Sequence, residues 1–589
     1  MPLDPVQLAL VQSRLDHVCQ QMGWIMMRTA RSPIFSLAHD FSCFITNGTG
    51  YLLSQADGLP IHTGGGGFAV RALLKAFGED IGKLDAFVLS DPYAAGGNHL
   101  PDWVIARPVF SGGRLVAFSC NRAHQSDIGG GAAGTYNSAA TEIFHEGIRL
   151  PPLRLVENGE VRDDLWRLLL LNSRTPELMN GDLHAMLGST RIGANQIAGL
   201  VESIGMERAE QYFEGILDLG DRRMRVEIDA LPDGTYTGED KTNNDCFEAG
   251  DHYVRVAIKI DGDRMAVDFT GTDPQVRGFK NSSIANTHSA VYVGLASFLN
   301  PELPGNEGTF RAVEVIAPLG TMVNARPPAP TTMNTLVPGT EIIHSIWRAL
   351  GKADPQRNCA GWGKGAVPTM SGTDANGETF VMYHWAAGAG AGAVDGRDGF
   401  NAMSGLVALG ALHLPDIELS EQKYPVRFLR QEFRTDSAGA GRFRGGTGID
   451  YAVEVETSAV LALRGEGLRT RSGFGVSGGG PGAEAQLKIT QLDGTEIGAP
   501  QYGILPVEPM VLEIKGAAGG GLGEPLSRDP ELVLRDVRDG IISRAAARKS
   551  YGVALTRNGR RVDAEATAAQ RAARRQDFKK RHARKKTAF

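Results

Sequence analysis

Two His-x-x-Asp pairs are the clearest candidates for chemistry in this sequence. His99 and Asp102 form the first pair, and His124 and Asp127 form the second, each pair lying beside glycines. Imidazole nitrogens and carboxylate oxygens suit a divalent transition metal such as Zn²⁺, Mn²⁺ or Fe²⁺. Side chains three residues apart can converge on one point, so the two pairs together predict a metal site.

The elements around these pairs must bring them together. Residues 104–110 and 115–120 predict two strands joined by a turn, and such a hairpin returns the second pair beside the first. Asp40 begins another predicted strand, where its carboxylate either completes the site or caps a turn. An alternative interpretation makes both His-Asp pairs buried structural hydrogen bonds.

Further candidate groups lie close to the pairs in the sequence. The carboxylates of Glu142 and Glu146 are predicted either to orient the metal ligands or to form surface ion pairs. Glycine clusters at 64–67 and 129–131 let the backbone approach a ligand closely, and their N–H groups suit a phosphate or an oxyanion. No Walker-type ATP motif and no Gly-x-Ser-x-Gly motif occurs in the sequence.

The composition narrows the class of protein. The chain has 589 residues, of which 42% are hydrophobic and 22% charged, as in ordinary globular proteins. A net charge of −6 argues against a nucleic-acid-binding protein. The five scattered cysteines form no Cys-x-x-Cys pair, which fits a reducing compartment. No secretory signal and no spanning segment is evident, so we expect a cytoplasmic protein that does not bind a membrane.

The hydrophobic pattern predicts a mixed α+β, multi-lobed chain with glycine-rich antiparallel sheets and an N-terminal helical, metal-binding portion. Apolar residues recur at helical spacing over residues 5–30, and helices are also predicted over 162–205. From about residue 222, apolar and polar residues alternate and turn at Asp-Gly, which predicts antiparallel strands beginning with Met224-Arg-Val-Glu-Ile-Asp. The 75 glycines are not periodic and favour tight turns and close backbone packing.

We expect about three structural units from the length of the chain. They are a metal-binding catalytic portion over 1–220, a mixed α+β portion over 221–410, and a β-rich portion with closing helices over 411–560. The basic segment 564–589 has almost no large apolar residues and is predicted to be a frayed helix or a disordered tail.

At these motifs the sequence resembles the hydantoinase B / oxoprolinase family. The resemblance runs through almost the whole chain and leaves out only the basic tail. The motifs that carry it are Asp40-Phe-Ser-Cys43, Asp91-Pro-Tyr93, His99-Leu-Pro-Asp102, Asn121-Arg-Ala-His124, Asp127-Ile-Gly-Gly130, Thr141-Glu-Ile-Phe144, Asp268-Phe-Thr-Gly-Thr272, Asp436-Ser-Ala-Gly-Ala-Gly441 and Gly519-Gly-Gly-Leu-Gly-Glu-Pro525. The sequence departs from the family pattern at Ser90 and Gln125, where asparagine and histidine are expected.

The resemblance implies the metal-containing subunit of an ATP-dependent cyclic amide hydrolase. Its implied partner is a hydantoinase A type subunit that binds ATP, in an α2β2 assembly, and its implied substrate is a small lactam, hydantoin or 5-oxoproline. The implied metal ligands are Asp40, His99, Asp102 and His124, with zinc or manganese favoured over iron.

The remaining candidate residues have supporting roles in this hypothesis. Asp127 is then not a ligand but lies beside the ligands, and either Asp127 or Glu142 relays a proton. Gly65, Gly66, Gly129 and Gly130 are the expected contacts for a phosphate or an oxyanion. Two rival hypotheses are a ketone carboxylase of the acetone or acetophenone type, which uses the same metal, and a metal-free scaffold for the ATPase subunit.

Overall fold

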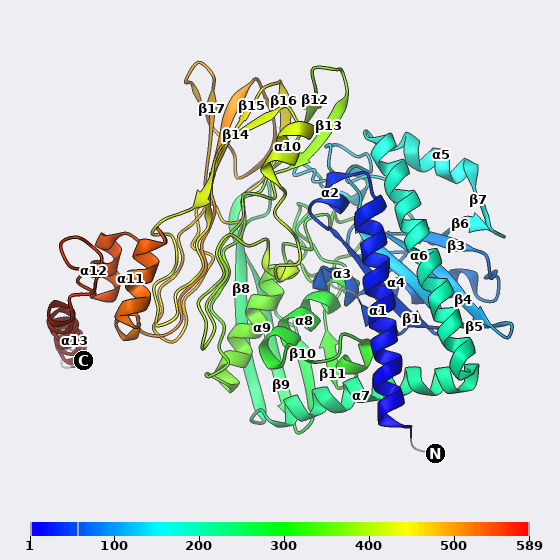
Figure 1. Cartoon of the computed structure of the whole chain (residues 1–589), viewed down its shortest axis with the longest axis horizontal. Helices are drawn as coiled ribbons and strands as arrows, with labels where there is room; N and C mark the ends of the chain where they lie inside the picture. The colour runs from blue at the N-terminus through cyan, green and yellow to red at the C-terminus, as the bar shows by residue number, and fades with distance from the viewer. Residues whose placement is uncertain (1–2, 56–57, 587–589) are drawn as a thin grey trace.

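The N-terminal part of the chain is built on an antiparallel sheet that carries the predicted metal-site residues. The computed structural model describes residues 3–55 and 58–586 and shows a mixed α+β fold, which confirms the predicted class (Figure 1). The strand order of this sheet is β2-β1-β5-β4-β3-β6-β7. The strands are β1 (Phe41–Asn47), β2 (Leu52–Gln55), β3 (Ala86–Leu89), β4 (Asp102–Ser111), β5 (Arg114–His124), β6 (Leu153–Glu157) and β7 (Glu160–Val161).

Helices cover both faces of this sheet. Long helices α1 (Pro5–Thr29) and α6 (Pro176–Ile204) pack against each other and share a core with Cys43 and Ile45 of β1. On the opposite face, α4 (Gly66–Phe77) packs on the alternate residues of the same strands. Smaller elements of this part are α2 (Pro33–Ser36), α3 (Pro60–Thr63), the 3-10 turn η1 (Ile143–His145) and α5 (Asp163–Leu171). This layered packing fixes the edge of the sheet at which the site is assembled.

One predicted strand is wrong. Residues 224–229 belong to helix α7 (Met206–Asp229), and the first strand of the second sheet begins only at Gly234. The sequence Met-Arg-Val-Glu-Ile-Asp alternates like a strand, but its buried residues Met224 and Ile228 are four apart. That spacing places both on one face of a helix, and packing against the second core selects the helix.

The second sheet has the order β11-β10-β9-β8, and helices α8 and α9 pack together beside it. Strands β8, β9 and β10 are antiparallel neighbours, whereas β11 runs parallel to β10. The elements are β8 (Gly234–Asn244), β9 (Ala249–Asp261), β10 (Arg264–Asp268), α8 (Ile284–Leu299), the 3-10 turn η2 (Glu307–Phe310), β11 (Val313–Ile316) and α9 (Gly339–Ala353).

Two further antiparallel sheets share one core in the C-terminal half. Their strand orders are β13-β12-β16-β19 and β14-β15-β20-β17-β18. The elements are β12 (Thr369–Thr373), β13 (Thr379–Tyr383), η3 (Leu406–Ala408), α10 (Ile417–Lys423), β14 (Val426–Phe433), β15 (Ile449–Val455), β16 (Ala459–Arg464), β17 (Gln486–Gln491), β18 (Glu496–Ile497), β19 (Tyr502–Val507) and β20 (Met510–Lys515).

Glycine-rich segments pack backbone against backbone below these sheets. A Cβ atom added at Gly519 would lie 1.8 Å from the carbonyl oxygen of Ala391, far inside van der Waals contact. The same close approach occurs at Gly446, where the nearest atom is the carbonyl oxygen of Phe400 at 1.8 Å. The high glycine content therefore reflects extended segments that approach more closely than any side chain permits.

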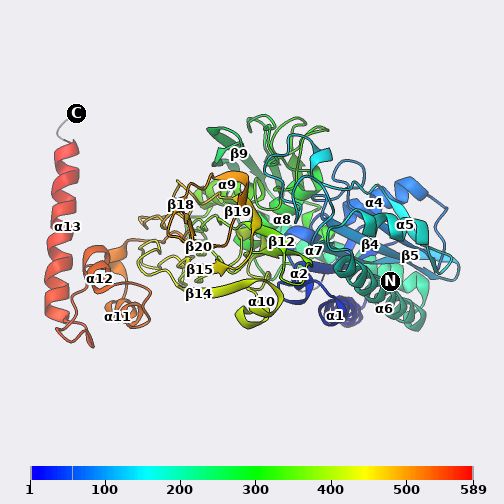
Figure 2. The same cartoon turned by 90° about the horizontal axis from the view of Figure 1, so that it is seen from above.

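The chain ends in helices that lie away from the N-terminal sheet. Helices α11 (Pro530–Arg538) and α12 (Arg544–Tyr551) follow the 3-10 turn η4 (Pro525–Ser527) and form their own small core. Helix α13 (Ala564–Lys586) stands at the extreme end of the molecule (Figure 2). Within the described ranges, every helix is too short or too polar to cross a bilayer.

Candidate metal centre

The antiparallel sheet brings the predicted ligands to one edge. Asp102 begins β4 and His124 ends β5, and the two residues face each other directly across the ladder, as the predicted hairpin requires. Asp40 precedes β1, which pairs with the other side of β5, and its backbone oxygen accepts a hydrogen bond of 3.1 Å from the His124 N–H. His99 lies in the loop that leads into β4.

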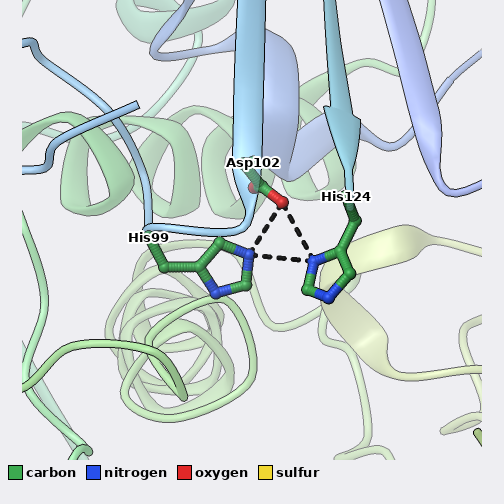
Figure 3. Close-up of side chains that lie close together, drawn as sticks. All are labelled: His99, Asp102 and His124. Atoms are coloured by element: carbon green, nitrogen blue, oxygen red, sulfur yellow. Dashed lines mark hydrogen bonds and ion pairs between the residues drawn. The ribbon is translucent and has the colours of Figure 1, made fainter. Parts of the chain in front are cut away.

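Three side chains meet within hydrogen-bonding distance of one another (Figure 3). His99 Nε2 lies 2.8 Å from Asp102 Oδ1, and His124 Nδ1 lies 3.1 Å from the same oxygen. The two ring nitrogens are 3.2 Å apart. All three side chains are almost completely buried. Ligand atoms that share one zinc ion at ~2.1 Å in tetrahedral geometry are about 3.4 Å apart, so a small movement would admit an ion.

A third histidine, His62, joins the cluster, and sequence reasoning missed it. It lies on α3, and its Nε2 is 3.5 Å from Asp40 Oδ1 and 3.4 Å from Asp102 Oδ2. It thereby links Asp40 to the other predicted ligands. Its one sequence signal is its place two residues before the glycine cluster at 64–67. A single histidine in that position gave no spacing to interpret.

Burial and neighbouring charges set different protonation states within the cluster. Burial lowers the pKa of both His62 and His124 to about 4, so both rings are neutral near pH 7. Burial opposes the charged forms of His99 and Asp102 too, but their mutual attraction outweighs it. The pKa of His99 is raised and that of Asp102 is held well below its ordinary value. Burial, with the charge of Asp102 nearby, raises the pKa of Asp40 well above its usual range.

The donor set fits a divalent transition metal. Asp40 Oδ1 and Asp102 Oδ2 are buried and have no hydrogen-bond partner among the described residues. A buried carboxylate oxygen without a partner is costly, and a cation relieves that cost. The ligand atoms of His99, Asp102 and His124 lie within 4.8 Å of one another. Two or three imidazole nitrogens with carboxylate oxygens are the usual donors for zinc and manganese.

A second layer of contacts orients His99. Its Nδ1–H donates to the backbone oxygen of Thr332 at 2.6 Å, which leaves Nε2 to face Asp102. The backbone N–H groups of Thr331 and Thr332 donate to the buried carboxylate of Glu146 at 2.7–2.9 Å. Burial raises the pKa of Glu146 to about 7, although these hydrogen bonds oppose the shift. Glu146 therefore positions the loop that holds His99.

Aromatic rings enclose the open side of His124. The Tyr136 ring stacks on His124 with centroids 5.7 Å apart and an interplanar angle of 16°. The Tyr383 ring stands edge-on to His124, and its hydroxyl donates to the backbone oxygens of Ser126 and Gly134. These rings limit the access of water to the cluster.

Asp127 and Glu142, the predicted proton-transfer residues, lie in different surroundings. The Asp127 carboxylate is buried, accepts hydrogen bonds from the N–H groups of Gly129 and Gly134, and pairs with Arg174 at 3.1 Å. These contacts favour a role in shaping the loop. The Glu142 side chain is exposed. Their catalytic roles stay predictions.

The four predicted phosphate-contact glycines lie at two separate turns. Gly65 and Gly66 are located where α4 begins, and the carbonyl oxygen of Gly65 faces the Arg122 guanidinium. Gly129 and Gly130 have φ values of 82° and 81°, which only glycine adopts readily. Contact of either turn with a phosphate also stays a prediction.

Comparison with known proteins shows similarity along most of the chain. The family model described as "Hydantoinase B/oxoprolinase" matches residues 4–525. The beta subunit of caprolactamase from Pseudomonas jessenii is 35% identical over 97% of this chain and 99% of its own. A putative D-/L-hydantoinase of Pseudomonas sp. (strain NS671) has a B-type chain that is 29% identical over 96% of this chain and 97% of its own.

A solved structure extends the similarity to three dimensions. The crystal structure of ATP-dependent caprolactamase from Pseudomonas jessenii superposes with a TM-score of 0.89 at 33% sequence identity. The match covers 97% of this chain and 100% of that one, so the two chains share their whole architecture.

Proposed function

The chain belongs to the hydantoinase B/oxoprolinase family, and on that premise we propose that it is the metal-holding subunit of an ATP-dependent enzyme that opens a small cyclic amide. The observation that carries this proposal is the buried convergence of His99, Asp102 and His124 at one edge of the sheet. Such a cluster in the interior of a protein is costly unless it serves a ligand or a reaction.

The proposed metal site consists of His99, Asp102 and His124, with Asp40 as a further carboxylate ligand. Zinc or manganese is favoured over iron for this mixture of nitrogen and oxygen donors. When bound, a divalent metal polarises a substrate oxygen and lowers the pKa of a bound water. The Glu146 carboxylate keeps His99 in the tautomer that presents Nε2, through the backbone of Thr332.

His62 has the best geometry for moving a proton within the cluster. Its Nε2 lies within 3.5 Å of carboxylate oxygens of both Asp40 and Asp102, and the raised pKa of Asp40 makes that carboxylate the one to which a proton at Nε2 passes. Burial keeps its pKa at about 4, so the ring is an acceptor near pH 7. The aromatic rings of Tyr136 and Tyr383 exclude bulk water, which keeps the proton within the site.

A separate subunit is proposed to activate the amide. Resonance makes an unstrained amide a poor electrophile, and transfer of a phosphoryl group from ATP to its carbonyl oxygen removes that resistance. Because this sequence contains no Walker-type ATP motif, we assign ATP to a hydantoinase A type partner, in an α2β2 assembly. Opening the ring then forms a C–O bond from one water and breaks the C–N bond, which frees the amine. A second water displaces the phosphoryl group as inorganic phosphate and leaves the carboxylate.

The test is ring opening and ADP release by the two-subunit complex with a panel of lactams, hydantoins and 5-oxoproline. We expect His99→Ala to lose both the bound metal and substrate turnover, whereas His17→Ala, an exposed histidine on α1, should keep both. Unchanged ring opening by His99→Ala would refute the metal-site proposal. A requirement for bicarbonate would instead favour a carboxylase, and a native chain free of metal would favour the scaffold hypothesis.

A further inference from the structure

A second enclosed space lies behind the aromatic rings that cover the candidate metal centre. It has a volume of about 60 Å³ and is bounded by the end of β16, the start of α9 and three connecting segments. Since one water needs ~10–15 Å³, the cavity has room for about four to six waters, or for a small ring. Its apolar lining includes Met333, Leu336, Val337, Ala387 and Leu406.

Arg464, the last residue of β16, lines this cavity and is 2% exposed. Its Nη2 donates to the Thr369 hydroxyl at 3.1 Å, but Nε and Nη1 have no hydrogen-bond partner among the described residues. No carboxylate of the described side chains lies within 4.0 Å of the guanidinium nitrogens. A buried cation without a counter-charge is costly, so this position calls for an anion from outside the chain.

The other charged groups nearby already have partners. The Glu466 carboxylate accepts hydrogen bonds from Lys280, Thr242 and Tyr502. The Lys364 ammonium group, which also lines the cavity, is 2.7 Å from Glu341. Lys364 also pairs with Asp240 at 3.0 Å, so these carboxylates are held by the two lysines, and Arg464 instead contacts the Tyr136 ring and the Thr369 hydroxyl.

Two more polar groups at the cavity are also unpaired. Trp385 Nε1 and Ser404 Oγ belong to lining residues, and both atoms are buried without a hydrogen-bond partner among the described residues. With Arg464 they supply donors of the kind that a carboxylate accepts. A phosphate has more oxygen acceptors than this largely apolar lining would satisfy.

One aromatic layer separates the cavity from the candidate metal centre. The Arg464 guanidinium carbon lies 3.6 Å from the centroid of the Tyr136 ring, which also stacks on His124. Trp385 stacks on Tyr383 at 5.4 Å with an interplanar angle of 13°. A ligand in the cavity is therefore one aromatic layer away from the cluster.

We propose that the Arg464 cavity binds the carboxylate of a small molecule with a short hydrocarbon body. Resting on the proposed function, this carboxylate has two possible sources: a substituent on the lactam substrate, or the acid group that forms when the ring opens. The guanidinium holds the carboxylate, and the apolar lining accepts the carbon atoms.

The experiment compares matched ligands by isothermal titration calorimetry on the two-subunit complex without ATP. The ligands are 5-oxoproline, 2-pyrrolidinone, which is the same ring without the carboxylate, and 4-aminobutyrate, the ring-opened product of 2-pyrrolidinone. We expect at least one carboxylate ligand to bind tenfold or more tightly than 2-pyrrolidinone, because hydrogen bonds to charged groups contribute at least about that factor. Binding of 5-oxoproline alone identifies a substrate carboxylate, and binding of 4-aminobutyrate alone identifies the product.

Variants test whether Arg464 is responsible. Arg464→Met should weaken carboxylate binding about tenfold or more, Arg464→Lys should restore part of it, and Arg430→Met, at a paired surface arginine on β14, should leave it unchanged. Equal binding of 5-oxoproline, 4-aminobutyrate and 2-pyrrolidinone to the native complex would overturn the proposal without any variant, as would full carboxylate binding by Arg464→Met.

The same titration on metal-depleted complex separates this proposal from the proposed function. Carboxylate binding that persists in a complex with no metal, together with turnover that does not need the metal, supports the cavity and refutes the metal-dependent reaction. Ring opening that needs the metal, together with carboxylate binding that does not depend on Arg464, supports the metal-dependent reaction and refutes the cavity.

Discussion

Replacing Asp102 with asparagine tests the metal centre most directly, because the change removes charge and almost no volume. The carboxylate is completely buried and lies within 3.4 Å of nitrogen atoms of His62, His99 and His124. The amide of Asp102→Asn keeps the shape of the site but carries no negative charge. We therefore expect the folded chain to lose most of its affinity for a divalent ion.

The size of the effect follows from ligand linkage. An ion present at 100 times its dissociation constant stabilises the folded state by about 2.7 kcal/mol. With an unfolding entropy of about 2.1 cal/mol/K per residue, 589 residues give roughly 1.2 kcal/mol/K. Dividing the stabilisation by this unfolding entropy gives a rise in Tm of about 2 °C if the chain unfolds as one unit. The rise is larger if the N-terminal portion unfolds separately.

Differential scanning calorimetry with zinc or manganese, against a chelator, measures this shift. Native protein should show the ion-dependent rise in Tm, and Asp102→Asn should show little of it. Asp127→Asn is the matched control, because Asp127 is equally buried but pairs with Arg174. The same ion-dependent rise in native protein and in Asp102→Asn would place the ion elsewhere and refute the reasoning.

Three further predictions test the surroundings of the site and the fold. Glu146→Gln should weaken metal affinity by roughly tenfold or more in competition with a chelator, because the loop that orients His99, a proposed ligand, loses the carboxylate that accepts its N–H groups. Gly519→Ala should lower the free energy of unfolding in urea by about 1–3 kcal/mol or more, whereas Gly498→Ala, with open space around it, should change it little. Burial raises the pKa of Asp398, but the Arg528 guanidinium more than reverses this and holds it below its ordinary value. Its stabilising contribution should be complete above about pH 4 and lost as the pH falls further, and Asp398→Asn should flatten that acid limb in thermal melts.

The sequence predicted the part of the site that local structure determines. Asp102 and His124 are joined by a short hairpin, and a hairpin brings its two ends together whatever the rest of the fold does. Asp40 was assigned from the family resemblance, and the sheet places it beside β5. These three positions depend on neighbouring strands, and their pairing is a regular property of antiparallel sheets.

The parts that the sequence did not predict depend on packing between distant segments. His62 reaches the cluster because α3 packs against β1 and α8, and no periodic pattern in the sequence encodes that contact. Arg464 reaches Tyr136 across more than 300 residues of sequence for the same reason. The prediction of a strand over 224–229 is wrong because the same alternation of apolar and polar residues also fits the last turns of a helix. Burial of Met224 and Ile228 on one face favours the helix over the strand.

Buried polar atoms without hydrogen-bond partners lie on both sides of the aromatic layer formed by Tyr136, Tyr383 and Trp385. On one side, one carboxylate oxygen each of Asp40 and Asp102 is buried without a hydrogen-bond partner among the described residues. On the other side, two nitrogens of the Arg464 guanidinium are also buried without a partner among those residues. Each would cost the folded chain free energy if nothing from outside completed it. A cation at the first position and a carboxylate at the second would satisfy both, and the Tyr136 ring touches both sites. Metal binding and carboxylate binding should therefore be coupled, with each ligand strengthening the affinity for the other by the same factor.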